Sequence, residues 1–361
     1  MPQTIGIITF HCSYNYGSAL QAYALQAYLN KNDKKVKVID FVLKSDFEQY
    51  HLFRTSLYKK HIKVFVADLL FFPKNYKRKK NFSKFLKTYI ELTEKTYFDS
   101  EQMRELNQQF DTFICGSDQI WNLACTRGIV PAYFLGFAND EKRKIAYAPS
   151  IAHLTFEDNL IQGLSYYLNR LDAISVREKS TIQVISSLTD KPVYHTLDPT
   201  LLLRKEDYTS IISPQKTSKY IFVYMLEYCE NLIQYVCKLS HKTGMKIIHI
   251  SRRGAWKYHH AKNVYGCSPN DFLSYIHYAD YIVTNSFHAT VFSIIFQKKF
   301  CTFKTKHSFS RMVDLLESVG LSKRLYKKQF DISQEIDFCE VNKKLEELKK
   351  DSMDFLERSL K

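Results

Sequence analysis

Short apolar runs of strand length alternate with helical patterns along most of the chain, and this alternation limits the folds open to it. The opening shows the repeating unit. Residues 4–10 form a continuous apolar run, residues 18–30 are rich in Ala, Leu and Gln, and residues 36–42 are again apolar. A strand, a helix and a second strand in this order indicate parallel neighbouring strands joined by a crossover helix. The sequence therefore predicts an α/β protein with parallel sheets.

The alternation occurs in two series that are separated by a polar stretch. Residues 204–219 are polar and contain Pro214, which is typical of a domain boundary. A length of 361 residues also favours two domains over one or three. We expect two Rossmann-like β-α domains that face each other across a cleft, with residues 1–205 in the first and residues 206–330 in the second. Residues 331–361 are charged and amphipathic and predict a C-terminal helix packed across the outside.

The remaining elements follow from the same patterns. Strands are expected at residues 110–115, 144–149, 173–176 and 194–197, and then at residues 220–226, 246–250, 280–283 and 297–303. Helices are expected at residues 177–187, 231–241, 270–277, 286–296 and 310–319. Trp121 follows the strand at 110–115, and we expect this large aromatic side chain to pack the loop down.

Residues 44–97 differ in character from the rest of the first series. They are helical by spacing, with an apolar centre at residues 64–72 and basic clusters at residues 59–63 and 74–80. Basic clusters on both sides of apolar residues are typical of a helix that lies on an anionic membrane, so residues 59–80 predict peripheral membrane contact. A helical insertion with a solvated basic face explains the pattern equally well.

The charge and the cysteine content limit the classes of binding partner and the cellular compartment that we expect. Lys plus Arg number 52 and Asp plus Glu number 37, a formal charge of +15 that favours anionic partners such as nucleic acid, anionic lipid or phosphorylated small molecules. The eight cysteines form no C-x-x-C pair, and no uninterrupted apolar segment approaches the length of a spanning helix. With no signal-peptide pattern at the start, we expect a cytoplasmic protein that can lie peripherally on the inner face of the cell membrane.

Polar side chains follow almost every predicted strand. They lie at residues 11–17, at Ser117 and Asp118, at Arg177, at Arg252 and Arg253, at residues 286–288, and at Lys304 and Lys306. Open α/β sheets bind ligands beyond the carboxyl ends of their strands, so we expect these groups to converge on the cleft. Several cations and one histidine with few acids predict that they bind an anion. No metal-binding or nucleotide-binding motif is present, so neither a metal nor a dinucleotide is expected.

Residues 281–296 are the most informative of these strand ends. A buried strand is expected to close there, and an apolar helix to open at Ser286, with His288 in its first turn. The N-terminus of such a helix presents backbone N–H groups and the positive end of its dipole, which suit a phosphate or a carboxylate. In the simpler alternative, Ser286 is only an N-cap and His288 a satisfied helix histidine.

Five segments together resemble the polysaccharide pyruvyl transferase family. They are residues 6–25 with Asn-Tyr-Gly-Ser-Ala-Leu-Gln, residues 116–122 with Gly-Ser-Asp-Gln-Ile-Trp-Asn, residues 174–178, residues 197–200, and residues 280–292 with Asn-Ser-Phe-His. The resemblance implies a GT-B-like fold and transfer of pyruvate from phosphoenolpyruvate, a co-substrate, to a sugar as a ketal, with no cofactor. Acceptors in the family are typically bacterial capsular, exopolysaccharide or cell-wall glycans, often carried on lipid.

The resemblance and the strand ends together suggest roles for individual residues. The catalytic residues expected are His288 as general acid or base, Arg177 and Lys304, although Lys306 is an equal candidate for the role of Lys304. Donor-binding residues are expected to be Asn285, Ser286, Arg252 and Arg311, and acceptor-binding residues to be Asn15, Tyr16, Gly17, Ser117 and Asp118. For Arg177, a structural ion pair with Glu178 or another acid is the competing interpretation.

One position departs from the pattern in other branches of the family, which have an arginine two residues before the histidine and a glycine directly after it. Here these positions hold Ser286 and Ala289. Donor phosphate binding would then depend on other residues.

Two further functions stay open at this stage. A GT-B glycosyltransferase would place the diphosphate of a nucleotide sugar at the same helix N-terminus. A non-catalytic protein that binds anions or nucleic acid would explain the aromatic residues interleaved with lysine in residues 50–87.

Overall fold

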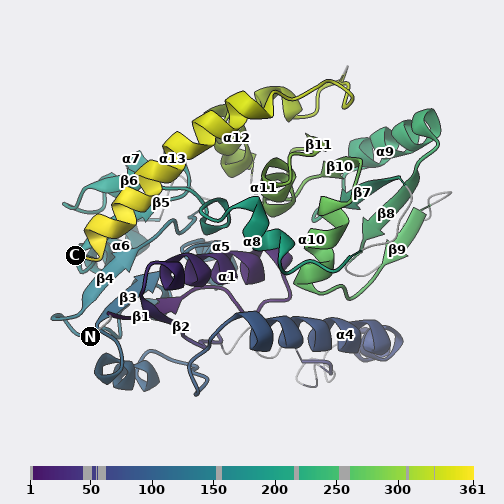
Figure 1. The fold of residues 1–361 in the computed structure, drawn as a ribbon. Helices are drawn as coiled ribbons and strands as arrows, with labels where there is room; N and C mark the ends of the chain where they lie inside the picture. The colour runs from purple at the N-terminus through teal and green to yellow at the C-terminus, as the bar shows by residue number, and fades with distance from the viewer. Residues whose placement is uncertain are drawn as a thin grey trace. The chain divides into compact units, whose positions relative to one another are not determined.

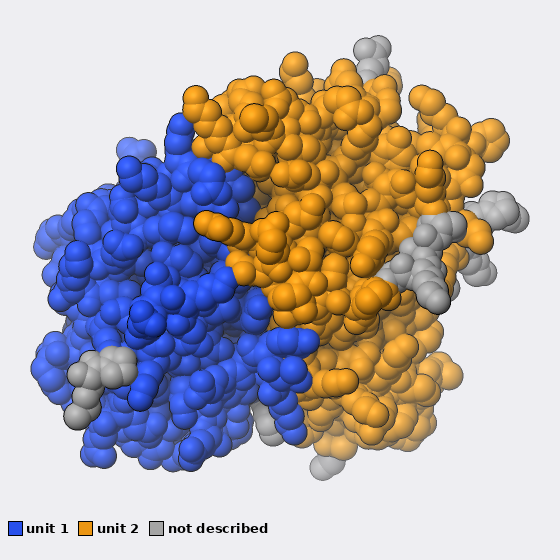
Figure 2. Space-filling view, viewed as in Figure 1, with its two compact units in different colours: residues 1–47, 86–203, 345–361 blue, residues 48–85, 204–344 orange. Residues whose placement is uncertain are grey.

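The computed structural model separates the chain into two compact units, which are described one at a time (Figures 1 and 2). The first unit comprises Met1–Phe47, Leu86–Leu203 and Leu345–Lys361, and the second comprises Glu48–Phe85 and Arg204–Lys344. The structure describes residues 3–43, 51–53, 55, 62–151, 157–214, 219–251, 261–305, 309–328 and 330–361. The predicted insertion at residues 44–97 thus falls in both units.

The first unit is built on a six-stranded sheet in the order β2-β1-β3-β4-β5-β6, in which all neighbours are parallel. The strands are β1 (Thr4–Ile8), β2 (Lys35–Val38), β3 (Thr112–Cys115), β4 (Arg143–Ala146), β5 (Ala173–Val176) and β6 (Val193–His195). The helices are α1 (Tyr16–Lys31), α5 (Leu123–Thr126), α6 (Asp158–Asn169) and α7 (Ile182–Ser186), with most of the C-terminal α13 (Phe338–Ser359). Short 3₁₀ turns are η1 (Gln102–Gln108), η2 (Pro131–Phe134), η3 (Lys179–Thr181) and η4 (Pro199–Leu201).

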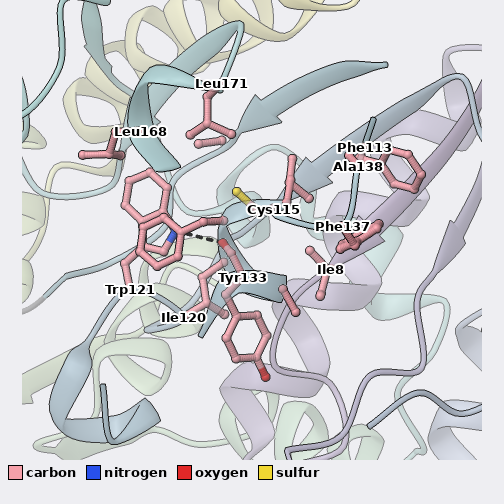
Figure 3. Close-up of a cluster of buried hydrophobic side chains, with 14 of the residues drawn as sticks. Ile8, Phe113, Cys115, Ile120, Trp121, Tyr133, Phe137, Ala138, Leu168 and Leu171 are labelled. Carbon is pink, nitrogen blue, oxygen red and sulfur yellow. Dashed lines mark hydrogen bonds between the residues drawn. The ribbon is translucent and has the colours of Figure 1, made fainter. Parts of the chain in front are cut away.

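The core of this unit contains the side chain of Trp121, which is fully buried. Its indole ring stacks on Phe134 with centroids 5.1 Å apart, and its Nε1–H donates to the carbonyl oxygen of Tyr133 at 2.9 Å (Figure 3). The indole thus ties the loop after β3 to η2. The prediction that Trp121 packs this loop down is confirmed.

The second unit contains a five-stranded parallel sheet in the order β11-β10-β7-β8-β9. The strands are β7 (Tyr220–Tyr224), β8 (Lys246–Ile250), β9 (Ala261–Val264), β10 (Tyr281–Thr284) and β11 (Lys299–Thr302). The helices are α8 (Lys205–Thr209), α9 (Glu230–Thr243), α10 (Pro269–His277), α11 (Phe287–Ile295) and α12 (Phe309–Ser318), with the turn η5 (Ser322–Arg324). The long helix α4 (Ile62–Tyr89) has all but its last four residues in this unit.

Two parallel sheets with crossover helices confirm the predicted α/β class. The expected strand at 36–42 is too long, because the ladder with β1 ends at the pair Ile7–Val38, and the chain then forms isolated bridges from Val38 to Leu92 and from Phe41 to Tyr97. β9 escaped prediction because its sequence, Ala-Lys-Asn-Val, is that of a half-exposed edge strand and lacks an apolar run. Among the described residues, no helix is both long and apolar enough to cross a membrane.

Candidate functional site

The junction of β10 and α11 has the predicted geometry, with a small shift of its boundaries. The strand extends to Thr284, and the helix begins at Phe287 after an extended Ser286. The hydroxyl of Ser286 accepts from the backbone N–H of Ala289 at 3.4 Å, so this serine is the N-cap. The positive end of the α11 dipole therefore lies just beyond the carboxyl end of β10.

Asn285 holds this turn in place through two partly buried hydrogen bonds. Its Oδ1 accepts from the backbone N–H of Leu226 at 2.7 Å, and its Nδ2 donates to the carbonyl oxygen of Glu227 at 2.7 Å. The side chain is 1% exposed. Asn285 thus ties the start of α11 to the segment that follows β7.

His288 and Arg311 both lie near the ring of Phe287 at the start of α11. The imidazole ring of His288 is perpendicular to the Phe287 ring, with centroids 5.2 Å apart, and the guanidinium of Arg311 lies 5.6 Å from the centroid of the same ring. Both residues are buried, at 8% and 6% exposure. The predicted catalytic histidine from α11 and a predicted donor-binding arginine from α12 therefore lie against the same aromatic ring.

Lys304 is exposed and lies two residues past β11, just as Ser286 lies two residues past β10. The two strands are neighbours in register, with Thr284 opposite Thr302. Lys304 therefore lies at the same edge of the sheet as Ser286. Arg252 and Lys306 fall outside the described residues, so the structure assigns them no place.

In the first unit, the N-terminus of α1 forms part of the corresponding sheet edge. Asn15 is an exposed N-cap whose Oδ1 accepts from the backbone N–H of Gly17 at 3.0 Å. Tyr16 and Gly17 are buried in the first turn of the helix. Of these three predicted acceptor residues, Asn15 is the one with its side chain exposed to solvent.

Ser117 and Asp118 lie at the end of β3 and bond mainly to the protein itself. The Ser117 hydroxyl donates to the carbonyl oxygen of Ala148 at 2.6 Å, and the residue is fully buried. The Oδ2 of Asp118 accepts from the Ser18 hydroxyl at 2.5 Å, and its Oδ1 accepts from the backbone N–H of Gln119 at 2.8 Å. These contacts join the end of β3 to α1, so both side chains shape the edge on which Asn15 is exposed.

Arg177 forms a buried ion cluster at the ends of β5 and β6. Its Nη1 lies 2.5 Å from Asp198 Oδ2 and its Nε lies 3.6 Å from Glu178 Oε1, with side-chain exposures of 3% for Arg177 and 0% for both acids. Burial alone would lower the pKa of the guanidinium, but the nearby Asp198, Glu178 and Asp118 raise it. One guanidinium thus faces three carboxyl groups, an arrangement that fits the competing interpretation of Arg177 as a structural residue.

The sequence did not reveal a pair between His11 and Asp40. The Nε2 of His11 lies 2.8 Å from Asp40 Oδ1, and Thr96 donates to Asp40 Oδ2 at 2.5 Å. Burial raises the pKa of Asp40, but the hydrogen bonds from His11 and Thr96 more than offset it, so this pKa lies below its usual range. The sequence contained one sign of this pair, because Asp40 is a carboxylate inside the apolar run at 36–42. A strand that ends before Asp40 would leave this residue at the edge of the sheet.

Solved structures with similar folds come from sugar-nucleotide enzymes. A protein from Listeria monocytogenes named as a UDP-N-acetylglucosamine 2-epimerase superposes with a TM-score of 0.53 at 9% identity, covering 99% of this chain and 88% of that chain. MnaA from S. aureus, solved with UDP, gives 0.52 at 12% identity, covering 96% and 88%. The UDP-N-acetylglucosamine 2-epimerase from Rickettsia bellii gives 0.50 at 10% identity, covering 99% and 96%. These similarities confirm the GT-B fold.

Comparison by sequence gives a different kind of information. A search of curated proteins found no match to the chain. The family model described as polysaccharide pyruvyl transferase matches residues 15–307, a segment that runs from the N-cap of α1 past β11 and includes both sheet edges. This chain therefore belongs to the polysaccharide pyruvyl transferase family of transferases.

Proposed function

We propose that the protein transfers the pyruvyl group of phosphoenolpyruvate to hydroxyl groups of a sugar residue and forms a pyruvate ketal. The acceptor in this proposal is a lipid-linked precursor of a bacterial capsular, exopolysaccharide or cell-wall glycan. Family membership supports the transferase class and a glycan acceptor. The observation that carries the choice of donor is that His288 and Arg311 both lie against the ring of Phe287 at the N-terminus of α11.

Phosphoenolpyruvate carries a phosphate and a carboxylate, and its binding site needs cations and hydrogen-bond donors. The start of α11 provides the positive end of a helix dipole, with the guanidinium of Arg311 beside Phe287. Lys304 adds an exposed ammonium group at the same sheet edge. In this proposal these groups take the place of the arginine that other branches carry at the position of Ser286.

The chemistry needs one proton donor, one proton acceptor and fixed positive charge. Protonated His288 donates a proton to the methylene carbon of the donor, so this carbon becomes a methyl group and C2 becomes electrophilic. A sugar hydroxyl adds to C2 and loses its proton. Cleavage of the bond from C2 to the bridging oxygen then releases phosphate, which keeps that oxygen. A second hydroxyl adds to C2, loses its proton and closes the ketal.

The first unit offers a different chemical environment, suited to hydroxyl groups. Asn15 has an exposed amide, and other strand ends of the same sheet contain Asp118 and the cluster around Arg177. Carboxyl groups around a single guanidinium disfavour an anionic donor, whereas sugar hydroxyls can donate to amide and carboxylate oxygens. We assign the acceptor to this unit, with Asn15 in contact and Ser117, Asp118 and Arg177 as positioning residues.

The test incubates purified protein with phosphoenolpyruvate and a panel of lipid-linked and free glycans containing galactose, glucose or N-acetylmannosamine. Mass spectrometry should show the mass gain of one pyruvyl ketal on at least one acceptor, with release of one phosphate. The His288→Ala variant should lose this activity and keep the wild-type urea midpoint. His277→Ala is the matched control, because His277 is a partly buried histidine that packs against Phe296, at the opposite end of α11.

Ligand-induced stabilisation separates this function from nucleotide-sugar transfer. Phosphoenolpyruvate should raise the melting temperature, since a ligand that binds only the folded state stabilises it, and UDP and GDP should not. Stabilisation by UDP without any by phosphoenolpyruvate would support the glycosyltransferase alternative. Wild-type turnover in His288→Ala would remove this histidine from the mechanism.

A further inference from the structure

Helix α4 exposes an apolar stripe on the face that points away from its packing partners. The stripe has the spacing of three and four residues that defines one helix face. Its members are Ile62, Phe65, Val66, Leu69, Leu70 and Tyr76. Ile62 is 68% exposed and Leu70 is 72% exposed. Large aliphatic side chains clustered at such exposure mark an interaction surface.

The opposite face of α4 is anchored in the second unit. The amide of Asn81 donates to the carbonyl oxygen of Gly266 at 2.6 Å, and the ammonium of Lys74 lies 4.0 Å from the centroid of the Tyr265 ring. Phe82 and Phe85 are buried on this side. The helix is therefore held by its inner face, and the apolar stripe is presented outward on a folded element.

The outer face changes from apolar to basic along its length. With 100° between successive residues, Lys77, Lys80 and Lys84 continue the angular positions of the apolar stripe, and all three are exposed. The whole helix carries eight Lys and Arg residues and a single acid, Asp68. One continuous surface thus offers aliphatic groups in its N-terminal half and ammonium groups in its C-terminal half.

We propose that this outer face binds the surface of an anionic lipid bilayer. The apolar stripe lies at the boundary of headgroups and acyl chains, and the lysines contact lipid phosphates. Aliphatic side chains such as Ile62 and Leu70 offer nothing to a nucleic acid backbone, which makes lipid the better match. If two copies of this surface met, the basic half of one would lie against either the basic half or the apolar half of the other. Neither arrangement is favourable, so self-association is disfavoured.

Vesicle binding tests the surface with the full chain and without donor or acceptor, so the result is independent of the proposed transfer reaction. The protein is sedimented with vesicles of phosphatidylcholine that contain phosphatidylglycerol, and with vesicles of phosphatidylcholine alone. Wild type should bind the anionic vesicles, more weakly as salt increases, because salt screens the contribution of the lysines. Failure of wild type to bind the anionic vesicles would overturn the proposal.

Two pairs of substitutions separate the apolar and the basic contributions. Leu69→Asp with Leu70→Asp should weaken binding at least about tenfold, since two aliphatic side chains are lost from the lipid boundary. Lys80→Gln with Lys84→Gln should weaken it about 30-fold on anionic vesicles, at roughly fivefold for each lysine. The matched control is Lys238→Gln with Lys242→Gln, which removes the same charge from exposed positions on α9 and should change binding less than about twofold.

Equal weakening by the α9 control would show that net charge alone drives binding, and the proposed surface would be wrong. A wild-type dimer in sedimentation velocity that both aspartate substitutions dissociate would assign the stripe to self-association instead. Tight binding of a random oligonucleotide that the same two substitutions abolish would assign it to nucleic acid. Because all of the substituted residues are exposed, each variant should keep the wild-type circular dichroism spectrum and urea midpoint.

Discussion

Replacement of Arg177 by methionine distinguishes a structural cation from one that binds the donor. Methionine keeps an unbranched chain of similar length but removes the guanidinium from Asp198 at 2.5 Å and Glu178 at 3.6 Å. Both acids have side chains that are 0% exposed, so their charges are left in a region without water. Removal of one partner from a buried ion pair typically costs about 3–5 kcal/mol. We expect Arg177→Met to destabilise the first unit by that amount, a large part of the ~5–15 kcal/mol that a domain has.

Urea unfolding followed by the fluorescence of Trp121 measures this loss, because Trp121 lies in the core of the same unit. The chain has two tryptophans, so the experiment uses a Trp256→Phe background. The matched control is Arg104→Met, which breaks an exposed pair with Glu101 and should leave the midpoint nearly unchanged.

A second substitution tests whether the loss of stability in Arg177→Met arises from the Asp198 carboxylate that is left without its cation. Asp198→Asn removes the charge and keeps an oxygen that can accept from the N–H of Thr200, as Asp198 Oδ1 does at 3.0 Å. Added to Arg177→Met, it should recover part of the lost stability, a coupling that a double-mutant cycle measures. An unchanged urea midpoint in Arg177→Met, together with loss of transfer, would refute the structural role and return Arg177 to the donor site.

Three further substitutions test local features of the second unit. Asn285→Ala should lower the free energy of unfolding by about 1–3 kcal/mol, since two partly buried hydrogen bonds are lost at about 0.5–1.5 kcal/mol each, and urea unfolding would show it. Gly266→Ala should cost about 1 kcal/mol or more, because φ is +62° and the new Cβ would lie 3.0 Å from the backbone nitrogen of Arg78 in α4. His249→Gln should flatten the dependence of stability on pH below about pH 6.5. Burial lowers the pKa of His249 against an opposing hydrogen bond with Asn263, so the unfolded chain binds a proton first as the pH falls. The stability of wild type is therefore complete above about pH 6.5 and declines as the pH falls toward the folded-state pKa, and an equal decline in the variant would exclude His249 as its source.

Apolar periodicity located most strands but could not locate their ends. The run at residues 36–42 stays apolar after Val38. Ile39 and Phe41 are buried in the core, although neither belongs to the ladder between β1 and β2. The ladder ends at Val38, and the backbone here bridges to Leu92 and to Tyr97, more than fifty positions along the chain. A single sequence contains no sign of these partners. The same error placed Asp40 inside a strand and hid its contact with His11.

Strand ends also predicted where polar groups gather, but not which groups bond to one another. Asp118 was correctly placed past β3, yet its hydrogen bond comes from Ser18, 100 positions away. Arg177 was correctly placed past β5, yet the position of Asp198 after the next strand decides whether its charge is available. By contrast, the capping role of Ser286 depends on residues within one helical turn, and the sequence already offered it as the simpler of two interpretations.

The formal charge of the whole chain combines two separate features, the charge at the sheet edges and the charge of helix α4. Around Arg177, one guanidinium faces three carboxyl groups, whereas the start of α11 combines a helix dipole with Arg311 and an exposed Lys304 nearby. An anionic donor is therefore favoured at the second unit and hydroxyl groups at the first. The formal charge of +15 says little about either edge, because α4 alone carries eight cationic residues and one acid. Much of the excess of positive charge thus belongs to α4 and not to the donor site, so neutralising the exposed lysines of α4 should change membrane binding while leaving transfer to a water-soluble acceptor intact.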